Sequence, residues 1–560
     1  MGRALISMVL ALAGGALADP GSPAAEDLLL RAWVDAGSLS SLRWPNFSSA
    51  RRDVTIFYAS NGYRPAWLRG SAATPQALAL IRILESAGSK GLDAEDYDGS
   101  RWRRRLARLS DANQNAADRA DFDLALTISG LRYLSDVHVG RVNPRVFCFG
   151  LDIDPKQCDL AGTLRGVANS SDVAQSIEKL EPPFPAYRRA QRALETYLDL
   201  ARRDDGELLP AVKKTDQPGD AYAGAGRLAR LLIELGDLPS GATPAAESQR
   251  YDGALVDAVK RFQVRHGIDP DGRIGQATLK QLNTPLSGRV RQLQLALERW
   301  RWVPTSFARP PVMVNIPEFR LRAFDERLEP ELEMKVVVGG AYRRQTPVFA
   351  NNMTHVIFRP YWNVPLSIQR NELTPKIAKD SSYLAKNDYE VVDSRDRVVA
   401  SEEVTPELLA KLRSGQLAIR QRPGVKNALG FVKFMFPNEY NVYLHGTPAK
   451  ALFSKSRRDF SHGCIRVEKP EELAAWVFKD RPEWTMQRIL EAEGGAKTQQ
   501  VNLLKPIPVL ILYATAVASE SGEVFFFDDI YGHDATLDKV LSNGYPYSGW
   551  QPPPARCRRR

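Results

Sequence analysis

The hydrophobic pattern of this 560-residue chain changes its period near Pro311, and that change limits the folds open to it. Before Pro311, apolar residues recur mainly at intervals of three and four, which is typical of one face of an α-helix. After Pro311, runs such as PPVMVNIP, FRLRAFD and FVKFMFPN favour β-strands. The chain is also too long for one hydrophobic core. We therefore expect a multidomain protein, helical towards its N-terminus and mainly β towards its C-terminus.

The first residues have the composition of a secretory signal. Arg3 precedes an apolar run from Ala4 to Leu12, and the Ala-Leu-Ala at 16–18 fits a small-x-small cleavage site. The run is shorter than the ~20 apolar residues that cross a membrane, and no later stretch is long and apolar enough. We expect residues 1–18 to be a signal peptide and the rest to be exported, with no stable membrane span.

The chain carries a modest excess of basic residues. Its formal net charge is +10, from 76 basic and 66 acidic residues. In an exported protein this balance suits anionic polymers of the cell envelope or membrane surfaces, and it gives no reason to expect nucleic acid as a partner. An ordinary soluble surface explains it equally well. Residues 536–560, which end in ARCRRR, are expected to form a disordered basic tail.

Two helical units precede the change of period. Residues 19–215 show no recognisable chemistry, so we expect a helical scaffold, in which Thr74 caps a helix that begins with proline. Residues 216–285 contain VDAVKRFQVRHGIDPDGRIGQATLKQL, which predicts two helices joined by a Pro-Asp-Gly turn. A helix within residues 286–310 links this smaller unit to the β-rich part.

The β-rich part, residues 311–535, is interrupted by a long insertion. The strand pattern lapses over residues 366–425, which predict helical and irregular structure, and long insertions of this kind are often lids. Alternation returns in NVYLHG, where Tyr443 and His445 face one way and Leu444 faces the other.

The chain has four cysteines. Cys148 and Cys158 bracket FGLDIDPKQ, whose glycine and proline allow the chain to turn back, so we expect them to pair. A disulfide across so short a loop stabilises a protein by roughly 2–3 kcal/mol. Two free buried thiols are the alternative. Neither Cys464 nor Cys557 has an evident partner.

Cys464 lies in DFSHGCIRVE, a setting that suggests a nucleophile. The thiolate is the reactive form of cysteine, so a general base must remove the thiol proton near neutral pH. His445, on a strand, could meet Cys464 on a neighbouring strand and form a thiolate–imidazolium pair with it. His462 is so close in sequence that its ring is expected to point away and to shape the loop.

The glycine before the cysteine suggests an oxyanion hole. Gly463 lets a substrate approach the backbone, and its N–H group and that of Cys464 could both donate to a developing oxyanion. The hydroxyl of Ser461 is a third candidate donor. Three other roles for Cys464 stay open: a structural thiol, a zinc ligand together with His445 and His462, and a disulfide partner of Cys557.

These residues resemble a known family. His445-Gly446-Thr447, a spacer, and then Ser461-His462-Gly463-Cys464-Ile-Arg-Val resemble the signature of the L,D-transpeptidase catalytic domain of the YkuD type. PYWNVP, QRPGVKNALGFVKFMFPN and FDDIYGHD extend the likeness to the large Gram-negative periplasmic subtype. The pattern F-Q-x3-G-I-x2-D-G-x-I-G-x2-T-x3-L-N in residues 216–285 resembles the three-helix peptidoglycan-binding domain.

The resemblance implies a reaction and a fold. Cys464 would attack the carbonyl between diaminopimelate and D-alanine of a peptidoglycan stem tetrapeptide, and a second stem amine would resolve the acyl-enzyme into a 3–3 cross-link. The implied fold is a helical scaffold, the three-helix domain and a mainly-β catalytic domain with an inserted lid. Arg466 is a candidate for binding a substrate carboxylate, or else it stabilises the loop. Tyr443, Gly446 and Trp362 are candidates for substrate binding, and packing in an aromatic core is the alternative for Tyr443 and Trp362.

The resemblance also implies where and with what the protein works. It places the protein in the periplasm, with peptidoglycan stem peptides and glycan as ligands and cell-wall synthases as partners, and it requires neither cofactor nor metal. It further implies acylation of the cysteine by carbapenems. Other acceptors would make the protein an L,D-carboxypeptidase or an enzyme that attaches proteins to peptidoglycan. A non-catalytic peptidoglycan-binding scaffold and a zinc-dependent peptidase are the remaining alternatives.

Overall fold

The computed structural model describes residues 25–156, 158–212, 214–241, 250–341, 344–399 and 404–547. The predicted signal peptide, residues 1–18, lies outside the described residues. The chain divides into two compact units: the first holds the residues up to Gly88, Leu92–His138 and Cys158–Glu181, and the second holds Ser89–Gly91, Val139–Gln157 and the chain from Pro182 onward. In the part that the structure describes, no helix is both long enough and apolar enough to cross a membrane.

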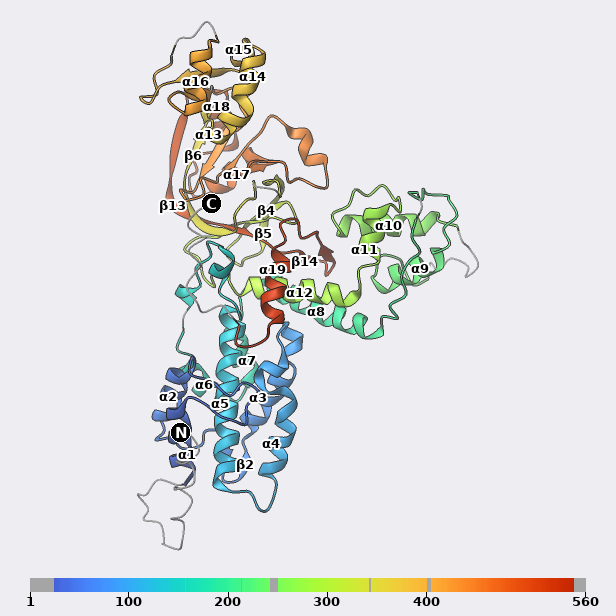
Figure 1. Cartoon of the computed structure of the whole chain (residues 1–560), viewed down its shortest axis with the longest axis vertical. Helices are drawn as coiled ribbons and strands as arrows, with labels where there is room; N and C mark the ends of the chain where they lie inside the picture. Colours follow the sequence, from blue (N-terminus) through green and yellow to red (C-terminus); the bar gives the residue numbers. More distant parts are fainter. Residues whose placement is uncertain are drawn as a thin grey trace. The chain divides into compact units, whose positions relative to one another are not determined.

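The first unit is helical, as predicted (Figure 1). Its central helix is buried along most of its length, and the predicted cap is present, because the Thr74 side chain accepts a hydrogen bond from Ala77 N at 3.1 Å. A short hairpin, β1 (Leu68–Arg69) and β2 (Ala72–Ala73), accompanies the helices. The helices are α1 (Ala25–Ala36), α2 (Arg51–Ala59), α3 (Pro75–Glu85), α4 (Trp102–Leu109), α5 (Ala116–Val139), α6 (Leu160–Ala168) and α7 (Val173–Glu178).

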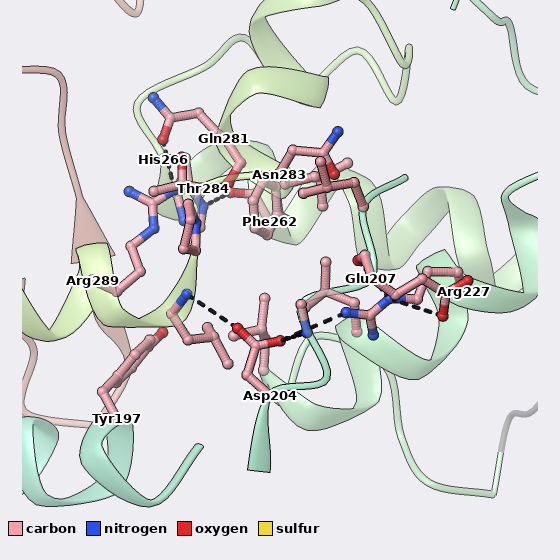
Figure 2. A pocket seen from close by; sticks show the side chains of 17 residues that line it. Tyr197, Asp204, Glu207, Arg227, Phe262, His266, Gln281, Asn283, Thr284 and Arg289 are labelled. Carbon is pink, nitrogen blue, oxygen red and sulfur yellow. Dashed lines mark hydrogen bonds and ion pairs between the residues drawn. The ribbon is translucent and has the colours of Figure 1, made fainter. Parts of the chain in front are cut away.

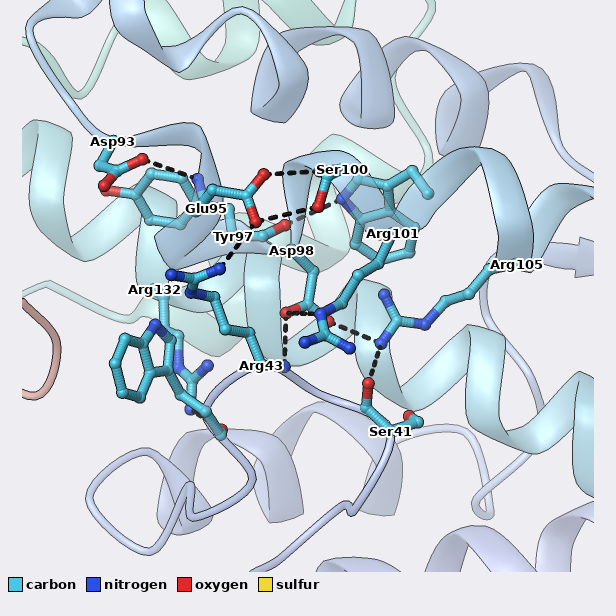
Figure 3. Close-up of polar contacts among 12 residues, drawn as sticks. Ser41, Arg43, Asp93, Glu95, Tyr97, Asp98, Ser100, Arg101, Arg105 and Arg132 are labelled. Carbon is cyan, nitrogen blue, oxygen red and sulfur yellow. Dashed lines mark hydrogen bonds and ion pairs between the residues drawn. The ribbon is translucent and has the colours of Figure 1, made fainter.

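A buried carboxylate organises one side of this unit. Asp98 is 1% exposed, accepts a hydrogen bond from Arg43 N at 2.8 Å and pairs with Arg105 Nη2 at 2.6 Å. Figure 3 shows Arg101 and Arg105 beside Asp98, whereas the Arg43 guanidinium contacts Glu95. A buried charge is tolerated when it is paired and hydrogen-bonded. The charged residues of this cluster therefore have a structural role.

The cysteine pairing predicted above is wrong. Cys158 is a free, exposed thiol, and Cys148 is disulfide-bonded to a partner that is not among the described residues. The reason lies in the course of the chain. Cys148 belongs to the second unit and Cys158 begins a segment of the first, so the intervening residues connect two units instead of closing a loop.

The second unit contains a helix that the sequence analysis placed in the scaffold. α8 (Pro185–Arg203) packs along α12 (Leu286–Trp300), and both contribute to one apolar cluster with Phe526 and Leu510 of the β-rich part. The compact unit that contains α1 to α7 ends at Glu181, so α8 packs with the second unit although the sequence analysis placed it within residues 19–215.

Three short helices form the small unit expected over residues 216–285. They surround their own core, which includes Leu228, Leu255, Val259 and Phe262. A pocket lined by both polar and apolar side chains lies where these helices meet α8 and α12, as Figure 2 shows. The helices are α9 (Ala225–Glu234), α10 (Gly253–Arg265) and α11 (Gln276–Leu282).

The β-rich part is a closed barrel with strand order β10-β11-β12-β5-β4-β3-β13-β6. Its interior is filled by Val, Ile, Leu, Phe and Met side chains that alternate inward along the strands. α17 (Pro470–Val477) and α18 (Met486–Gly494) pack against it. The strands are β3 (Val312–Asn315), β4 (Arg320–Phe324), β5 (Pro330–Val337), β6 (Phe349–Phe358), β10 (Val432–Met435), β11 (Leu444–His445), β12 (Ile465–Val467) and β13 (Gln499–Leu512).

The insertion contains strands as well as helices, which corrects the prediction. β7 (Trp362–Asn363), β9 (Ala418–Gln421) and β8 (Tyr389–Val392) form a three-stranded antiparallel sheet. Its helices α14 (Thr374–Lys379), α15 (Tyr383–Lys386) and α16 (Pro406–Ser414) gather in one group in Figure 1. The insertion buries Leu373, Ile377, Leu412 and Ile419 in a core of its own.

A helix spans the start of the segment that was expected to be a disordered tail. α19 (His533–Ser542) crosses the expected start at residue 536, and its Leu537 and Leu541 join the barrel's apolar cluster. The prediction of disorder is therefore wrong for the start of this segment. Residues 548–560 lie outside the described residues.

Candidate active site

His445 lies on β11, and Cys464 directly precedes β12, the strand that pairs in parallel with β11. In the pairing of β11 with β12, Leu444 is opposite Ile465 and His445 is opposite Arg466. Leu444 and Ile465 are fully buried in the barrel core. Because side chains alternate along a strand, the residues on either side of them, including Cys464 and His445, face the outside of the barrel.

The His445 imidazole is buried and oriented by the backbone. The side chain is 4% exposed, and its Nδ1 lies 2.6 Å from the carbonyl oxygen of Gly446. A carbonyl can only accept, so Nδ1 carries the proton and Nε2 is left with a free lone pair. Burial, with the cations of Arg466 and Lys433, lowers the pKa of His445 to about 3, although hydrogen bonds to the backbone of Gly446 and Leu429 oppose the shift.

The Cys464 thiol is half-buried and free of any disulfide. Its Sγ lies 3.7 Å from the carbonyl oxygen of Asn441. Burial raises the pKa of Cys464, although hydrogen bonds from Tyr443 and the charges of Lys433 and Arg466 oppose the rise. The raised cysteine pKa and the lowered histidine pKa both favour a neutral thiol and a neutral imidazole over the thiolate–imidazolium pair when no substrate is bound.

The side-chain hydroxyl of Ser461 stabilises the loop before Cys464. Ser461 Oγ donates to the Cys464 carbonyl at 2.5 Å and accepts the Gly463 N–H at 3.1 Å. Thr346 Oγ1 donates to the Gly463 carbonyl at 2.7 Å, and Gly463 adopts a φ of 119°, which favours glycine. The Ser461 and Gly463 donors are therefore already engaged, which corrects the expectation that both serve an oxyanion. The Cys464 N–H has no acceptor among the described residues.

His462 points away from the thiol, as expected. Its Nε2 lies 2.7 Å from Glu372 Oε1 in the insertion, and Arg344 Nη2 lies 2.7 Å from the same oxygen. Burial raises the pKa of Glu372, but His462 and Arg344 outweigh it and hold that pKa below its ordinary value. The zinc ligation considered for His445, His462 and Cys464 is not supported, because the His462 ring is turned to Glu372. Within the described ranges, no three His, Cys, Asp or Glu side chains are grouped so that they could hold a metal ion.

Two of the three candidate cleft residues lie beside the thiol. The Tyr443 ring centroid is 5.7 Å from that of His445, and the pKa of Tyr443 is raised by burial, by the charge of Cys464 and by hydrogen bonding to it. The Trp362 indole hydrogen-bonds to Tyr443 and brings β7 of the insertion to the site. Gly446 is packed against its neighbours instead of lining the cleft. A Cβ at this position would lie 3.4 Å from Pro470 Cγ, so the residue is not open to a substrate.

Lys433 is a site residue that the sequence did not reveal. It lies on β10 directly opposite His445, and its Nζ is 3.9 Å from the centroid of the Tyr443 ring. The alternation within FVKFMF puts Lys433 on the outer face, but a single sequence does not show that β10 pairs with β11 in this register. Arg466, a candidate from its place in the motif, lies on the other side of His445.

Comparisons with known proteins agree with this architecture. Residues 310–483 match the model of the L,D-transpeptidase catalytic domain, YkuD, and residues 52–194 match the Scaffold domain. Residues 226–282 match the "Putative peptidoglycan binding domain". The chain is also 31% identical over 257 residues to a "Putative L,D-transpeptidase" of Haemophilus influenzae, covering 46% of this chain and 51% of that protein. The chain thus spans about half the length of this relative.

Two of the matched segments contain the barrel residues of the candidate site and the small helical unit. The catalytic match covers the barrel strands that carry Lys433, His445, Cys464 and Arg466, and the shorter match covers α9 to α11. The chain is therefore a multidomain protein in which separate segments match an L,D-transpeptidase catalytic domain, YkuD, a peptidoglycan-binding domain and a scaffold domain.

Proposed function

We propose that the protein is a peptidoglycan L,D-transpeptidase whose nucleophile is Cys464. The observation that supports this most strongly is the pairing of β11 with β12. It puts a half-exposed thiol diagonally beside a buried imidazole whose Nε2 is free, on the outer face where a peptide can approach. A substrate carbonyl carbon must reach Sγ while the thiol proton reaches the base, and this arrangement meets both needs.

In the first half-reaction, Sγ of Cys464 attacks the carbonyl carbon between diaminopimelate and D-alanine, and the thiol proton passes to Nε2 of His445. The carbonyl π electrons move to oxygen, where the N–H of Cys464 donates to the oxyanion. As the tetrahedral intermediate collapses, the C–N bond breaks and His445 returns its proton to the departing D-alanine amine. A thioester on Cys464 remains.

In the second half-reaction, the side-chain amine of another stem attacks the thioester. His445 accepts a proton from that amine, the C–S bond breaks, and Cys464 leaves as a thiolate that regains the proton. The product is a 3–3 cross-link. Water as the acceptor would give a tripeptide, so the acceptor alone separates a transpeptidase from an L,D-carboxypeptidase.

The remaining proposals follow from this reaction. The substrate lies in the periplasm of a Gram-negative envelope, which is consistent with the expected signal peptide and with a peptidoglycan-binding domain in the chain. Cell-wall synthases that supply stem peptides are proposed partners. A carbapenem is a proposed acylating inhibitor of Cys464, because a thiolate can open its strained β-lactam ring.

Product analysis tests the proposal. The mature chain is incubated with disaccharide-tetrapeptide, and the products are separated and weighed, beside Cys464→Ala and Cys158→Ala. Dimers that lack one D-alanine are expected from the wild type and from Cys158→Ala, and not from Cys464→Ala. Tripeptide monomers alone would indicate a carboxypeptidase, and turnover by Cys464→Ala would contradict the cysteine mechanism.

A further inference from the structure

Two cations flank the proposed general base on the outer face of the barrel. Lys433 on β10 is opposite His445 on β11, and His445 is opposite Arg466 on β12, so the three residues form one row across three strands. Neighbouring strands are about 4.8 Å apart, and residues directly opposite each other point to the same side of a sheet. Both cations therefore stand on the same face as Cys464.

Neither cation is neutralised by the protein. Within the part of the chain that the structure describes, Lys433 and Arg466 form no ion pair with a carboxylate, and the buried Nε of Arg466 has no hydrogen-bond partner. Burial lowers the pKa of both cations. In each case the charge of Cys464, when it is a thiolate, raises the pKa and so opposes the effect of burial. A half-buried cation without a counter-ion is costly, so an anion at this position would be bound favourably.

The charges and aromatic rings around the thiol suit an anionic ligand. Tyr443 and Trp362 present aromatic surface, the Lys433 ammonium lies over the Tyr443 ring at 3.9 Å, and no carboxylate faces the thiol from β10, β11 or β12. His355 on β6, the other strand beside β10, has a pKa lowered by burial and by Lys433, so it adds no negative charge. The surroundings of Cys464 are cationic and aromatic.

We propose that Lys433 and Arg466 form a receptor for a carboxylate that the substrate carries next to its reacting carbonyl. The identity of that substrate as a stem peptide rests on the proposed function, whereas the receptor itself does not. A carboxylate bound here offsets both charges beside His445, so the imidazole accepts the Cys464 proton more readily when a substrate is bound than when the site is empty. Recognition of the substrate and activation of the base are thereby linked.

A pair of alkylating reagents tests the receptor without requiring turnover. Iodoacetate carries a carboxylate and iodoacetamide is its neutral counterpart, and both react with the thiolate, so the ratio of their rates cancels differences in cysteine pKa. The rates are measured on the full mature chain by mass spectrometry of the peptides that contain Cys464 and Cys158. Cys158 is the internal control, because it is exposed and its charged neighbours are Asp159 and Asp53.

The ratio of the iodoacetate rate to the iodoacetamide rate is expected to be about tenfold higher at Cys464 than at Cys158, the size of a charge-assisted hydrogen bond. Lys433→Met should lower the ratio at Cys464 severalfold, and Lys433→Arg, which keeps the charge, should retain it. An equal ratio at the two cysteines in the wild-type chain overturns the receptor, whether or not the variants fold. An unchanged ratio in a folded Lys433→Met chain removes Lys433 from it.

The same experiment separates the receptor from the proposed function. A chain that prefers iodoacetate at Cys464 but does not process the tetrapeptide keeps the receptor and loses the proposed substrate. A chain that forms cross-links without that preference keeps the function and loses the receptor.

Discussion

Glu372 of the insertion and His462, two residues before Cys464, are joined by a contact of 2.7 Å between Oε1 and Nε2. Arg344 shares the same carboxylate oxygen, so the contact fastens the insertion to the cysteine loop through one acidic side chain. The groups are partly exposed, and contacts of this kind contribute about 0.2–1 kcal/mol. This free energy is small relative to the stability of the whole fold, but it is sufficient to bias the position of a single segment.

Glu372→Gln is expected to loosen this attachment. Amide hydrogen exchange should rise in the peptides that contain residues 366–373 and 461–464, and kcat/KM should fall severalfold while the midpoint of thermal unfolding changes little. Glu407→Gln, on exposed α16 of the same insertion, is the matched control and should leave both peptides unchanged. If exchange in the cysteine loop is the same in both variants, Glu372 does not hold the insertion there.

Ser461→Ala should damage the cysteine loop. The hydroxyl is 3% exposed and serves both the Cys464 carbonyl and the Gly463 N–H, so its loss leaves two buried groups without a partner. Each such group costs about 1–3 kcal/mol. We expect a lower free energy of unfolding in urea and at least a tenfold lower kcat. Ser461→Thr keeps the hydroxyl and should restore most of both values; equal losses in the two variants would contradict this role.

Acid should destabilise the protein before its carboxylates titrate. Burial is the largest cause of the lowered pKa of His445, to about 3, of His533, to about 4, and of His266 and His355. Between these values and the ordinary pKa of about 6.5, the unfolded chain binds more protons than the folded chain, so stability is lost as the pH falls below 6.5.

The measurement is the free energy of urea unfolding at several pH values between 7 and 5. Each fully titrating histidine contributes at most about 1.4 kcal/mol per pH unit. His445→Asn should reduce the slope by about one proton relative to the wild type. His462→Asn, which changes an exposed ring, should leave a slope closer to that of the wild type. A stability that is constant or rises on acidification would contradict the neutral, buried His445.

The sequence allowed the parts of the fold that depend on local pattern to be predicted. The change of period near Pro311, the Thr74 cap and the strand that carries His445 follow from spacing along the chain, and the structure has all three. The motif around Cys464 indicated the proposed nucleophile and base because cysteine and histidine are rare residues and stand here in distinctive settings. These predictions needed no knowledge of which distant segments pair.

The parts that were missed depend on such distant pairing. β8 and β9 are four residues each and show little alternation, and they are strands because they pair with each other and with β7. Cys148 and Cys158 are close in sequence but belong to different units. Lys433 is an ordinary lysine on a strand until the register of β10 with β11 is known.

The most direct test of the account is the mass of the protein during turnover. The mature chain is mixed with tetrapeptide substrate, quenched in acid, weighed intact and then mapped by peptide. The account predicts an added mass equal to the substrate less D-alanine, carried by the peptide that contains Cys464, and absent from Cys464→Ser under the same conditions. Cross-linked product without any adduct on Cys464, or an adduct on Cys158 that accounts for turnover, would contradict it.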